Sequence, residues 1–415
     1  MSFFASRWVD APAHVTDLGG GLPAGFRAGA AAAGIKADGA IDLGLMVCDA
    51  YEAVSAARYT RSGVLAAPVL VSRDETTPNG MRAVIANSGN ANAATGEEGM
   101  QDARAMQRAT ALALGMERGA VAVASTGVIG VPLVLDGLEA AVAAATAALR
   151  PDGDEAFNDA IMTTDAFQKR ASLQVQLPSG VVRLSAQAKG AGMIEPAFAT
   201  MLCFVQTDAA LEPETAELLL SVCIKRSFDR ISVDGQLSTN DTVILQCSGA
   251  SGVRVAPESE DELRFGEALD ALLRMLAIMI VRDGEGSKRI GRIVVRGGSG
   301  AVVERCARAI ANSPLVKTAL HGADPNWGRI AQSVGGALGG PDPIAQPLML
   351  DIEIEGITVC AGGVAVPCDL DALNAAAAGL EIEYEVGLPG AGFETEVIFS
   401  DLSHEYVTIN AEYTT

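Results

Sequence analysis

The stretch Lys189–Leu202, which reads KGAGMIEPAFATML, is unlike an ordinary helix or strand. Two glycines and a proline bracket an apolar turn, and the small residue Ala199 comes directly before the hydroxyl residue Thr200. A strand-like run, Met201–Gln206, follows. A turn built from glycine and proline can hold a peptide bond in a strained geometry. Thr200 therefore stands at the head of an expected strand, behind a turn that can strain the bond before it.

A threonine in this position can act as a nucleophile if the chain is cut just before it. The Thr200 hydroxyl attacks the Ala199 carbonyl, an ester forms, and water hydrolyses the ester. The new chain then begins with Thr200, whose free α-amine has a pKa of about 8 and lies within reach of its own hydroxyl. A threonine that opens a strand is structural far more often than nucleophilic, so this reading depends on other motifs.

Histidine and metal chemistry have little support in the sequence. The three histidines, His14, His321 and His404, are spread over the whole chain, and no His-x-x-x-His or zinc-type Cys/His spacing occurs. No Gly-x-Ser-x-Gly elbow surrounds a serine. We therefore expect no metal site and a catalytic base other than histidine.

Strand-like and helix-like segments alternate along the chain. The expected strands are 82–86, 120–124, 172–177, 181–186, 242–247, 292–296 and 348–355. The expected helices are 100–114, 138–149, 213–230 and 258–282, and the last 40 residues read as strands with turns. This order predicts an α/β (α+β layered) fold of stacked β-sheets covered by helices.

The charge balance excludes several classes of partner. Lysine and arginine number 30 against 51 aspartates and glutamates, which gives a net charge of −21. Nucleic acids and anionic membrane surfaces attract clustered basic residues, so we expect neither as a partner. No apolar run reaches the roughly 18 residues of a transmembrane helix, and the first residues lack the pattern of a signal peptide. We expect a cytoplasmic protein whose seven cysteines are reduced and mostly buried.

Residues 189–202 resemble the self-cleavage segment of the ornithine acetyltransferase family, whose hallmark is Lys-Gly-x-Gly-Met-Ile-x-Pro followed by Ala-Thr-Met. Six further motifs resemble those of the family and occur in its order. They are Asn87–Ala93, Ser125–Gly130, Met162–Asp165, Ser238–Thr242, Asp324–Arg329 and Tyr406–Tyr413. On these motifs the chain is identified as a member of the family, from about Gly25 to its end.

The resemblance implies a precursor that is cut between Ala199 and Thr200 into an α fragment, residues 1–199, and a β fragment, residues 200–415. The fragments would stay together as a heterotetramer of two of each. The implied fold is layered and is similar to that of β-aminopeptidases such as DmpA. The implied reaction moves an acetyl group from N-acetylornithine to glutamate in arginine biosynthesis. It needs no cofactor, although some members also accept acetyl-CoA as a substrate.

The resemblance also implies roles for individual residues. Thr200 would be the nucleophile and, through its amine, the base. Thr126 and Gly127 follow the expected strand 120–124, and a turn there can aim a hydroxyl and an N–H at one point, as an oxyanion hole requires. Without the resemblance, a plain strand-ending turn would be the favoured interpretation of these two residues. One nucleophile that serves both half-reactions implies ping-pong transfer.

The remaining matches concern the substrate. Lys189 would bind an amino-acid carboxylate, and Glu285 would bind the ammonium group of ornithine. Thr163, Asn410 and Thr415 match the other substrate-contact positions. Their structural alternatives are a solvated surface lysine, an ordinary charge at a helix end, a polar residue at a strand end and a frayed tail.

Two motifs and one glycine-rich segment keep alternative interpretations. Asp324–Arg329 belongs either to the site or to a capped helix start, and Asn87–Asn92 either lines the site or satisfies backbone groups. The segment Asp283–Lys288 fails the P-loop pattern, so we interpret it as a turn after a long helix.

The chain also departs from the usual family pattern. Ala197 and Phe198 replace Asn-Met, Gln236 interrupts a Val-Asp-Gly-Asp motif, residues 58–61 replace a Phe-Thr-Thr-Asn stretch, and residues 413–415 lack a common basic residue. The acyl acceptor therefore stays open. The alternatives are a paralogue that acts on another amino acid, an N-terminal-nucleophile amidohydrolase, and a binding protein without activity.

Overall fold

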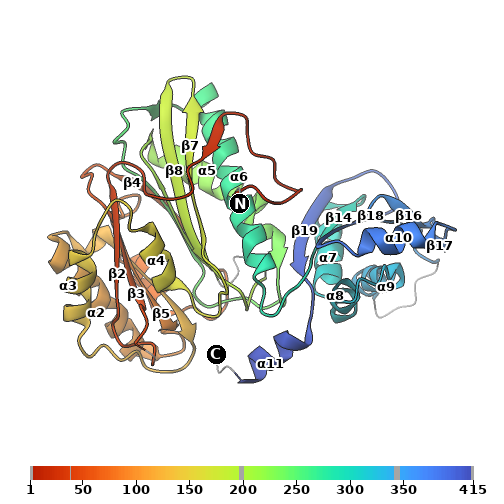
Figure 1. Ribbon diagram of the computed structural model, residues 1–415, viewed down its shortest axis with the longest axis horizontal. Helices are drawn as coiled ribbons and strands as arrows, with labels where there is room; N and C mark the ends of the chain where they lie inside the picture. Colours follow the sequence, from red (N-terminus) through yellow and green to blue (C-terminus); the bar gives the residue numbers. More distant parts are fainter. Residues whose placement is uncertain (1–2, 38, 196–200, 341–345, 413–415) are drawn as a thin grey trace.

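The computed structural model describes residues 3–37, 39–195, 201–340 and 346–412. Two β-sheets stack face to face between layers of helices, and a third sheet forms a second part of the molecule (Figure 1). Mixed sheets covered by helices confirm the predicted α/β layering. Among the described residues, no helix is long and apolar enough to cross a membrane. All seven cysteines are free and six are buried, as predicted.

The first sheet has four strands in the order β2-β3-β5-β6. Their bounds are β2 Phe26–Ala31, β3 Leu43–Cys48, β5 Ala83–Asn90 and β6 Val121–Val128. The helices α1 (Ala67–Asp74), α2 (Gly96–Leu114) and α3 (Leu138–Ala147) share a buried cluster with its outer face. Its inner face and α4 (Asp154–Ile161) share another cluster with the second sheet.

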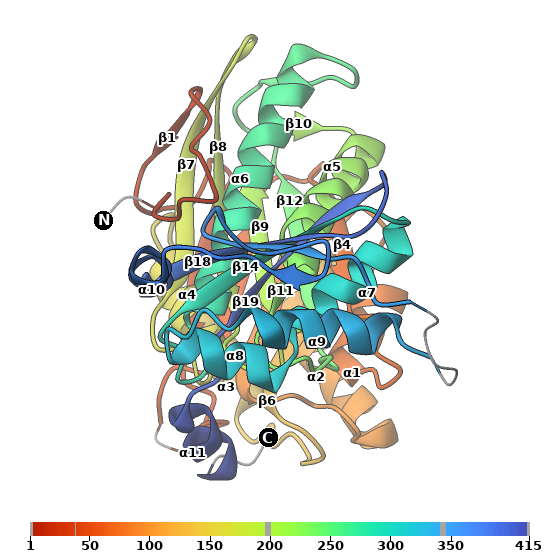
Figure 2. The same cartoon turned by 90° about the vertical axis from the view of Figure 1, so that its right-hand side faces the viewer.

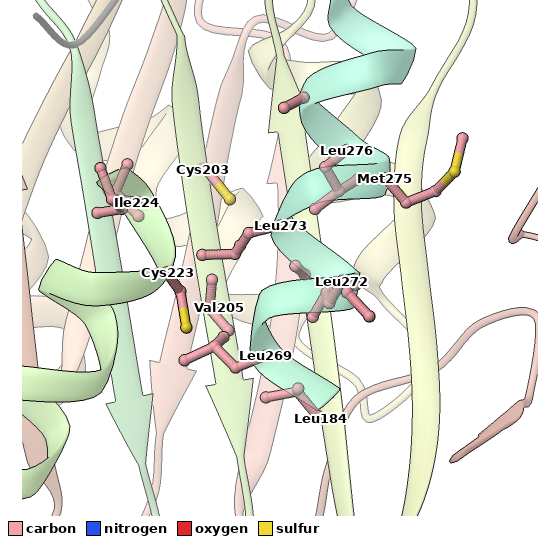
Figure 3. Close-up of a cluster of buried hydrophobic side chains, with 14 of the residues drawn as sticks. Leu184, Cys203, Val205, Cys223, Ile224, Leu269, Leu272, Leu273, Met275 and Leu276 are labelled. Carbon is pink, nitrogen blue, oxygen red and sulfur yellow. The ribbon is translucent and has the colours of Figure 1, made fainter. Parts of the chain in front are cut away.

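The second sheet has six strands in the order β1-β7-β8-β9-β12-β4. Their bounds are β1 Val15–Asp17, β4 Val54–Tyr59, β7 Lys169–Leu177, β8 Gly180–Lys189, β9 Leu202–Thr207 and β12 Thr242–Cys247. The helices α5 (Pro213–Arg226) and α6 (Glu260–Arg282) cover its other face, and Figure 3 shows their side chains meeting those of the strands.

Alternating burial on both faces explains why the central residues of β9 and β12 are apolar. In β9, Leu202 and Phe204 belong to the cluster between the two sheets, whereas Cys203 and Val205 belong to the cluster under α5 and α6. Because successive side chains in a strand point to opposite faces, a strand between two cores needs an apolar residue at every position. Residues 202–205 of β9 and 243–245 of β12 meet this requirement, and the buried polar residues Gln206, Thr207, Thr242 and Gln246 lie at or next to the strand ends.

The third sheet has seven strands in the order β11-β19-β14-β18-β15-β16-β17. Their bounds are β11 Ile231–Ser232, β14 Ile290–Arg296, β15 Asp351–Ile354, β16 Ile357–Ala361, β17 Val364–Ala365, β18 Glu381–Gly387 and β19 Glu394–Ser400. The helices α7 (Gly300–Ala311), α8 (Pro314–His321) and α9 (Trp327–Leu338) share its core (Figure 2).

The remaining elements are short. They are the strand pair β10 (Ala210–Leu211) and β13 (Arg254–Val255), the 3₁₀ turns Arg118–Ala120 and Phe228–Arg230, and the helices α10 (Leu370–Ala377) and α11 (His404–Glu412). The expected strand 348–355 is shorter in the structure, and the expected helix 213–230 ends at Arg226 before a 3₁₀ turn. The prediction of strands and turns alone for the last 40 residues is wrong, because α11 is a helix.

Candidate active site

Six of the predicted site residues line one cavity between the three sheets. They are Thr126, Gly127, Thr163, Lys189, Glu285 and Asn410. They come from the ends of β6 and β8, the turns after α4 and α6, and the C-terminal helix α11, which lies between the two parts of the molecule in Figure 1. Ala199, Thr200 and Thr415 lie outside the described residues, so their roles and the division at 199/200 remain predictions.

Thr126 and Gly127 lie just before Val128, the last residue of β6, and not in a turn after the strand as expected; the pairing with β5 shifts register here. A Cβ atom at Gly127 would lie 2.3 Å from the carbonyl carbon of Gly89, and its φ is +133°. Only glycine fits such close contact with the backbone of the neighbouring strand. The two strand ends therefore fix the Gly127 peptide tightly against β5.

Lys189 is buried at the end of β8, with 3% of its surface exposed. Its Nζ donates hydrogen bonds of 2.9 Å to the hydroxyls of Thr126 and Thr163. Burial lowers the pKa of Lys189, while the charge of Asp165 opposes this shift. The alternative of a solvated surface lysine is wrong. Because the Thr126 hydroxyl accepts from Lys189, its own proton is left to be donated elsewhere.

A second buried lysine lies behind the first. Lys169 Nζ donates to Asp165 Oδ1 at 2.6 Å and to Asp283 Oδ2 at 2.5 Å. Asp165 Oδ1 also accepts from the Gly190 N–H at 2.7 Å, which fixes the backbone directly after Lys189. Burial alone would raise the pKa of Asp165, but the two lysines and this N–H lower it to about 2. Asp165 and Asp283 lie in segments noted in the sequence, but the sequence did not predict that they share a buried lysine.

Glu285 connects three segments at the edge of the cavity. Its N–H donates to the Ala191 carbonyl at 3.0 Å, and its carboxylate accepts from Thr164 Oγ1 at 2.9 Å and Asn410 Nδ2 at 2.6 Å. A Cβ atom at Gly192 would lie 2.6 Å from this carboxylate. A side chain at position 192 would therefore displace the Glu285 carboxylate from its present position. The turn 283–288 follows α6, as predicted.

The helix α11 brings Tyr406 and Asn410 to the cavity. The Tyr406 hydroxyl donates to Asp234 Oδ2 at 3.4 Å. Burial, with the charges of Asp234 and Glu285, raises the pKa of Tyr406. The alternative of a strand-end position for Asn410 is wrong, because Asn410 lies on a helix and bonds to Glu285.

Two aspartates hold the chain on either side of the predicted cleavage segment. Asp234 accepts from the N–H groups of Met193 at 2.6 Å and Ile194 at 2.9 Å. Met193 has a φ of +57°, a left-handed conformation that is unfavourable for its side chain. On the other side, Asp241 Oδ1 accepts from the Met201 N–H at 2.9 Å. Sequence reasoning missed both roles, although Asp241 lies in a quoted motif.

The structure distinguishes between the two interpretations given for Asn87–Asn92 and for Asp324–Arg329. Asn87 and Asn92 donate to the carbonyls of Asn90 and Gly99, so this segment mainly satisfies backbone groups, although Ala91 lines the cavity. In Asp324–Arg329, the Asn326 side chain caps α9 by accepting from the Arg329 N–H at 3.3 Å.

The cavity offers both signs of charge. One ammonium group, that of Lys189, and two carboxylates, those of Asp234 and Glu285, lie among hydroxyl and amide groups. Such a surface suits a zwitterionic amino acid better than an apolar ligand. Within the described ranges, no group of three or more His, Cys, Asp or Glu residues is placed to hold a metal ion.

Comparison with known proteins gives long matches. The model of the ArgJ family matches residues 27–415. The arginine biosynthesis bifunctional protein ArgJ of Symbiobacterium thermophilum is 41% identical over 404 residues, which cover 96% of this chain and 99% of the relative. The protein of that name from Chlorobium chlorochromatii is 43% identical over 411 residues, 97% of this chain and 94% of the relative.

Solved structures give partial matches. The ornithine acetyltransferase of Mycobacterium tuberculosis, crystallised with ornithine, is 41% identical and has a TM-score of 0.40. The match covers 44% of this chain and 98% of that one.

Proposed function

This chain belongs to the ArgJ family, and we propose that it transfers an acetyl group from N-acetylornithine to glutamate through an acetyl ester on Thr200. The observation that carries the proposal is the single cavity that gathers Thr126, Gly127, Lys189 and Glu285. These residues supply hydrogen-bond donors for an oxyanion and charges of both signs for an amino acid. The residue after Thr200, Met201, is fixed by a hydrogen bond from its N–H to Asp241 Oδ1.

In the first half-reaction, the Thr200 hydroxyl attacks the acetyl carbonyl carbon and its proton passes to the Thr200 α-amine. The Gly127 N–H and the Thr126 hydroxyl donate to the oxyanion, and two such donors supply several kcal/mol, at about 3–4 kcal/mol each. The carbon–nitrogen bond to ornithine then breaks, and the leaving amine takes the proton. Ornithine departs, and Thr200 carries the acetyl ester.

In the second half-reaction, the amine of glutamate attacks the ester carbon. The Thr200 oxygen leaves with a proton and N-acetylglutamate departs, so the enzyme is restored. The same cavity must hold a donor with a cationic tail and an acceptor with an acidic tail. Glu285 would attract the cationic tail of the donor. Lys189 would attract a carboxylate of the donor in the first half-reaction and a carboxylate of the acceptor in the second.

The chemistry requires no cofactor, and acetyl-CoA would be an alternative acetyl donor. We propose that the α fragment (1–199) and the β fragment (200–415) remain associated in a cytoplasmic heterotetramer of two of each. Size-exclusion chromatography with mass measurement tests the assembly.

Intact mass spectrometry followed by activity measurement tests the function. We expect fragments 1–199 and 200–415, and acetyl transfer from N-acetylornithine that depends on glutamate. Thr200→Ala should remain uncut and inactive. An uncut wild-type chain, or a chain that releases free acetate at the same rate with and without glutamate, contradicts the proposal; the second result identifies an amidohydrolase.

A different acceptor is the second candidate, and Gln236 favours it. This residue lines the cavity where the usual motif has an aspartate, so the cavity has one carboxylate fewer. A panel of amino acids offered with N-acetylornithine distinguishes the two. Faster transfer to an amino acid other than glutamate would assign the chain to a paralogous reaction.

A further inference from the structure

The first cut of the chain needs a base that the finished enzyme does not need. Before the cut, the nitrogen of Thr200 is part of the peptide bond, so it cannot take the proton of the Thr200 hydroxyl. We propose, on the basis of the function above, that Oδ2 of Asp241 is the general base for self-cleavage. After the cut, the new amine takes over this role for acetyl transfer.

The fold fixes Asp241 against Met201, the residue that follows the predicted nucleophile in the sequence. It lies directly before β12, which pairs in parallel with β9, so that Thr242 faces Leu202. Its Oδ1 accepts from the Met201 N–H at 2.9 Å, and the Thr242 N–H donates to the Met201 carbonyl at 3.1 Å. The Met201 nitrogen is the atom to which Thr200 is covalently bonded. One oxygen of the carboxyl group is thus anchored to the residue that directly follows Thr200 in the chain.

The second oxygen is buried without a partner. Asp241 is fully buried, and within the described part of the chain its Oδ2 has no hydrogen-bond partner. A buried carboxylate oxygen without a partner costs about 1–3 kcal/mol or more, so its presence in a folded protein calls for an explanation. An anchored carboxyl group with one free oxygen is what a general base requires.

The surroundings of Asp241 also suit a base. Burial raises its pKa well above the usual range, while the Met201 N–H, the nearby hydroxyls of Ser238 and Thr60, and the charge of Lys189 on β8 act in the opposite direction. A carboxyl group whose pKa is raised binds a proton more strongly, as a group that takes the proton of a hydroxyl must.

Neighbouring groups fit the role less well. Lys189 Nζ already donates to two hydroxyls. Both oxygens of Asp234 are occupied, because Oδ2 accepts from Met193 and Oδ1 accepts from Ile194. Among these three charged groups, only Asp241 has an oxygen free to take a proton.

Self-cleavage proceeds through an ester and needs only water as a co-reactant. Asp241 Oδ2 takes the hydroxyl proton as the Thr200 oxygen bonds to the Ala199 carbonyl carbon. The bond from that carbon to the Thr200 nitrogen breaks, and the nitrogen takes the proton from Asp241. Water then attacks the Ala199 ester and gives its proton to Asp241. The Thr200 oxygen leaves and recovers a proton, which gives a carboxylate at Ala199 and a free threonine terminus.

The full chain made by cell-free synthesis tests the proposal, because cutting can be followed from the moment of translation. The rate of appearance of fragments 1–199 and 200–415 is measured between pH 5 and 9 for the wild type and Asp241→Asn. The asparagine variant keeps an oxygen to accept from Met201 but cannot act as a base. We expect its cutting rate to fall about 10²- to 10⁴-fold and to lose the rise with pH that the wild type shows.

Asp208→Asn is the matched control, because the Asp208 carboxyl group is also buried and its Oδ1 accepts from a backbone N–H, that of Arg183 at 2.7 Å, at the end of β9 away from Met201. We expect cutting to slow less than tenfold, with the rise with pH retained. Cutting of Asp241→Asn at the wild-type rate, or slow cutting with the wild-type pH dependence, overturns the proposal. If the wild type is never cut, the proposed function itself is contradicted, whatever the result for Asp241→Asn.

Discussion

Replacement of Gly127 by alanine tests the oxyanion hole most directly. The new Cβ would lie 2.3 Å from the Gly89 carbonyl carbon and 2.5 Å from the Asn90 nitrogen. Since carbon atoms normally pack at about 3.5–4.0 Å, β6 or β5 must move by roughly 1 Å to make room. Both atoms belong to backbone, so no side chain can rotate away.

A shift of this size displaces the Gly127 N–H from the oxyanion. A misplacement of about 1 Å costs about 10²-fold in rate, and loss of one oxyanion donor costs about 10²- to 10³-fold. These factors correspond to about 2.7–4 kcal/mol of transition-state stabilisation. We expect kcat to fall by this factor and KM for N-acetylornithine to change little, because the donor acts on the transition state.

The assay is glutamate-dependent ornithine release per mole of cut chain, with the cut fraction measured first by intact mass. Gly130→Ala is the matched control. Gly130 also has a positive φ, of +78°, but apart from its chain neighbours no atom of the described residues lies within 4 Å of the position of its Cβ. It should lose about 1–2 kcal/mol of stability and keep its activity. A kcat of Gly127→Ala within twofold of the wild type would refute the role of this N–H.

Three further predictions concern charges in and near the cavity. Glu285→Gln should raise KM for N-acetylornithine about 10- to 100-fold, because a charge-assisted contact contributes about 1.5–3 kcal/mol, and should change KM for glutamate less; equal changes would count against this assignment. Lys169→Met leaves the buried carboxylates of Asp165 and Asp283 without their cation, so urea denaturation should show a loss of about 3–5 kcal/mol, and an unchanged midpoint would contradict this. Burial lowers the pKa of Lys317 to about 7, so between about pH 7 and 10.5 the unfolded state binds a proton that the folded state lacks. The free energy of unfolding should therefore rise with pH in this window, by up to about 1.4 kcal/mol per unit, and Lys317→Met should lack this slope; equal slopes would show that this lysine is not the cause.

Local patterns in the sequence located the layers and much of the site. The strand Thr242–Cys247 has the predicted bounds, and its apolar run Val243–Leu245 is what indicates a buried strand. Thr126 and Gly127 were expected in a turn after residues 120–124, but they lie within β6, because pairing with β5 extends this strand to Val128. The resemblance to a known family added Lys189 and Glu285, which no local pattern distinguishes from surface charges.

Long-range contacts explain what the sequence did not reveal. The helix α11 contains the strand-forming residues Val407, Thr408 and Ile409, and none of its residues is buried. Its link to the cavity comes from the contact between Asn410 and Glu285, which are 125 positions apart. Lys169 meets Asp283 across 114 positions. Pairings of this kind depend on how the sheets stack, which no local pattern encodes.

The strand order of the six-stranded sheet has a consequence for a chain divided after residue 199. The strands β9 and β12 would belong to the second piece, yet β8 flanks β9 and β4 flanks β12, and both of these come from the first piece. Six residue pairs join each of these boundaries. Separation of the two polypeptides would break the hydrogen bonds of both strand pairs at once. Dilution should therefore never separate the halves of a native molecule, and both should melt in one transition.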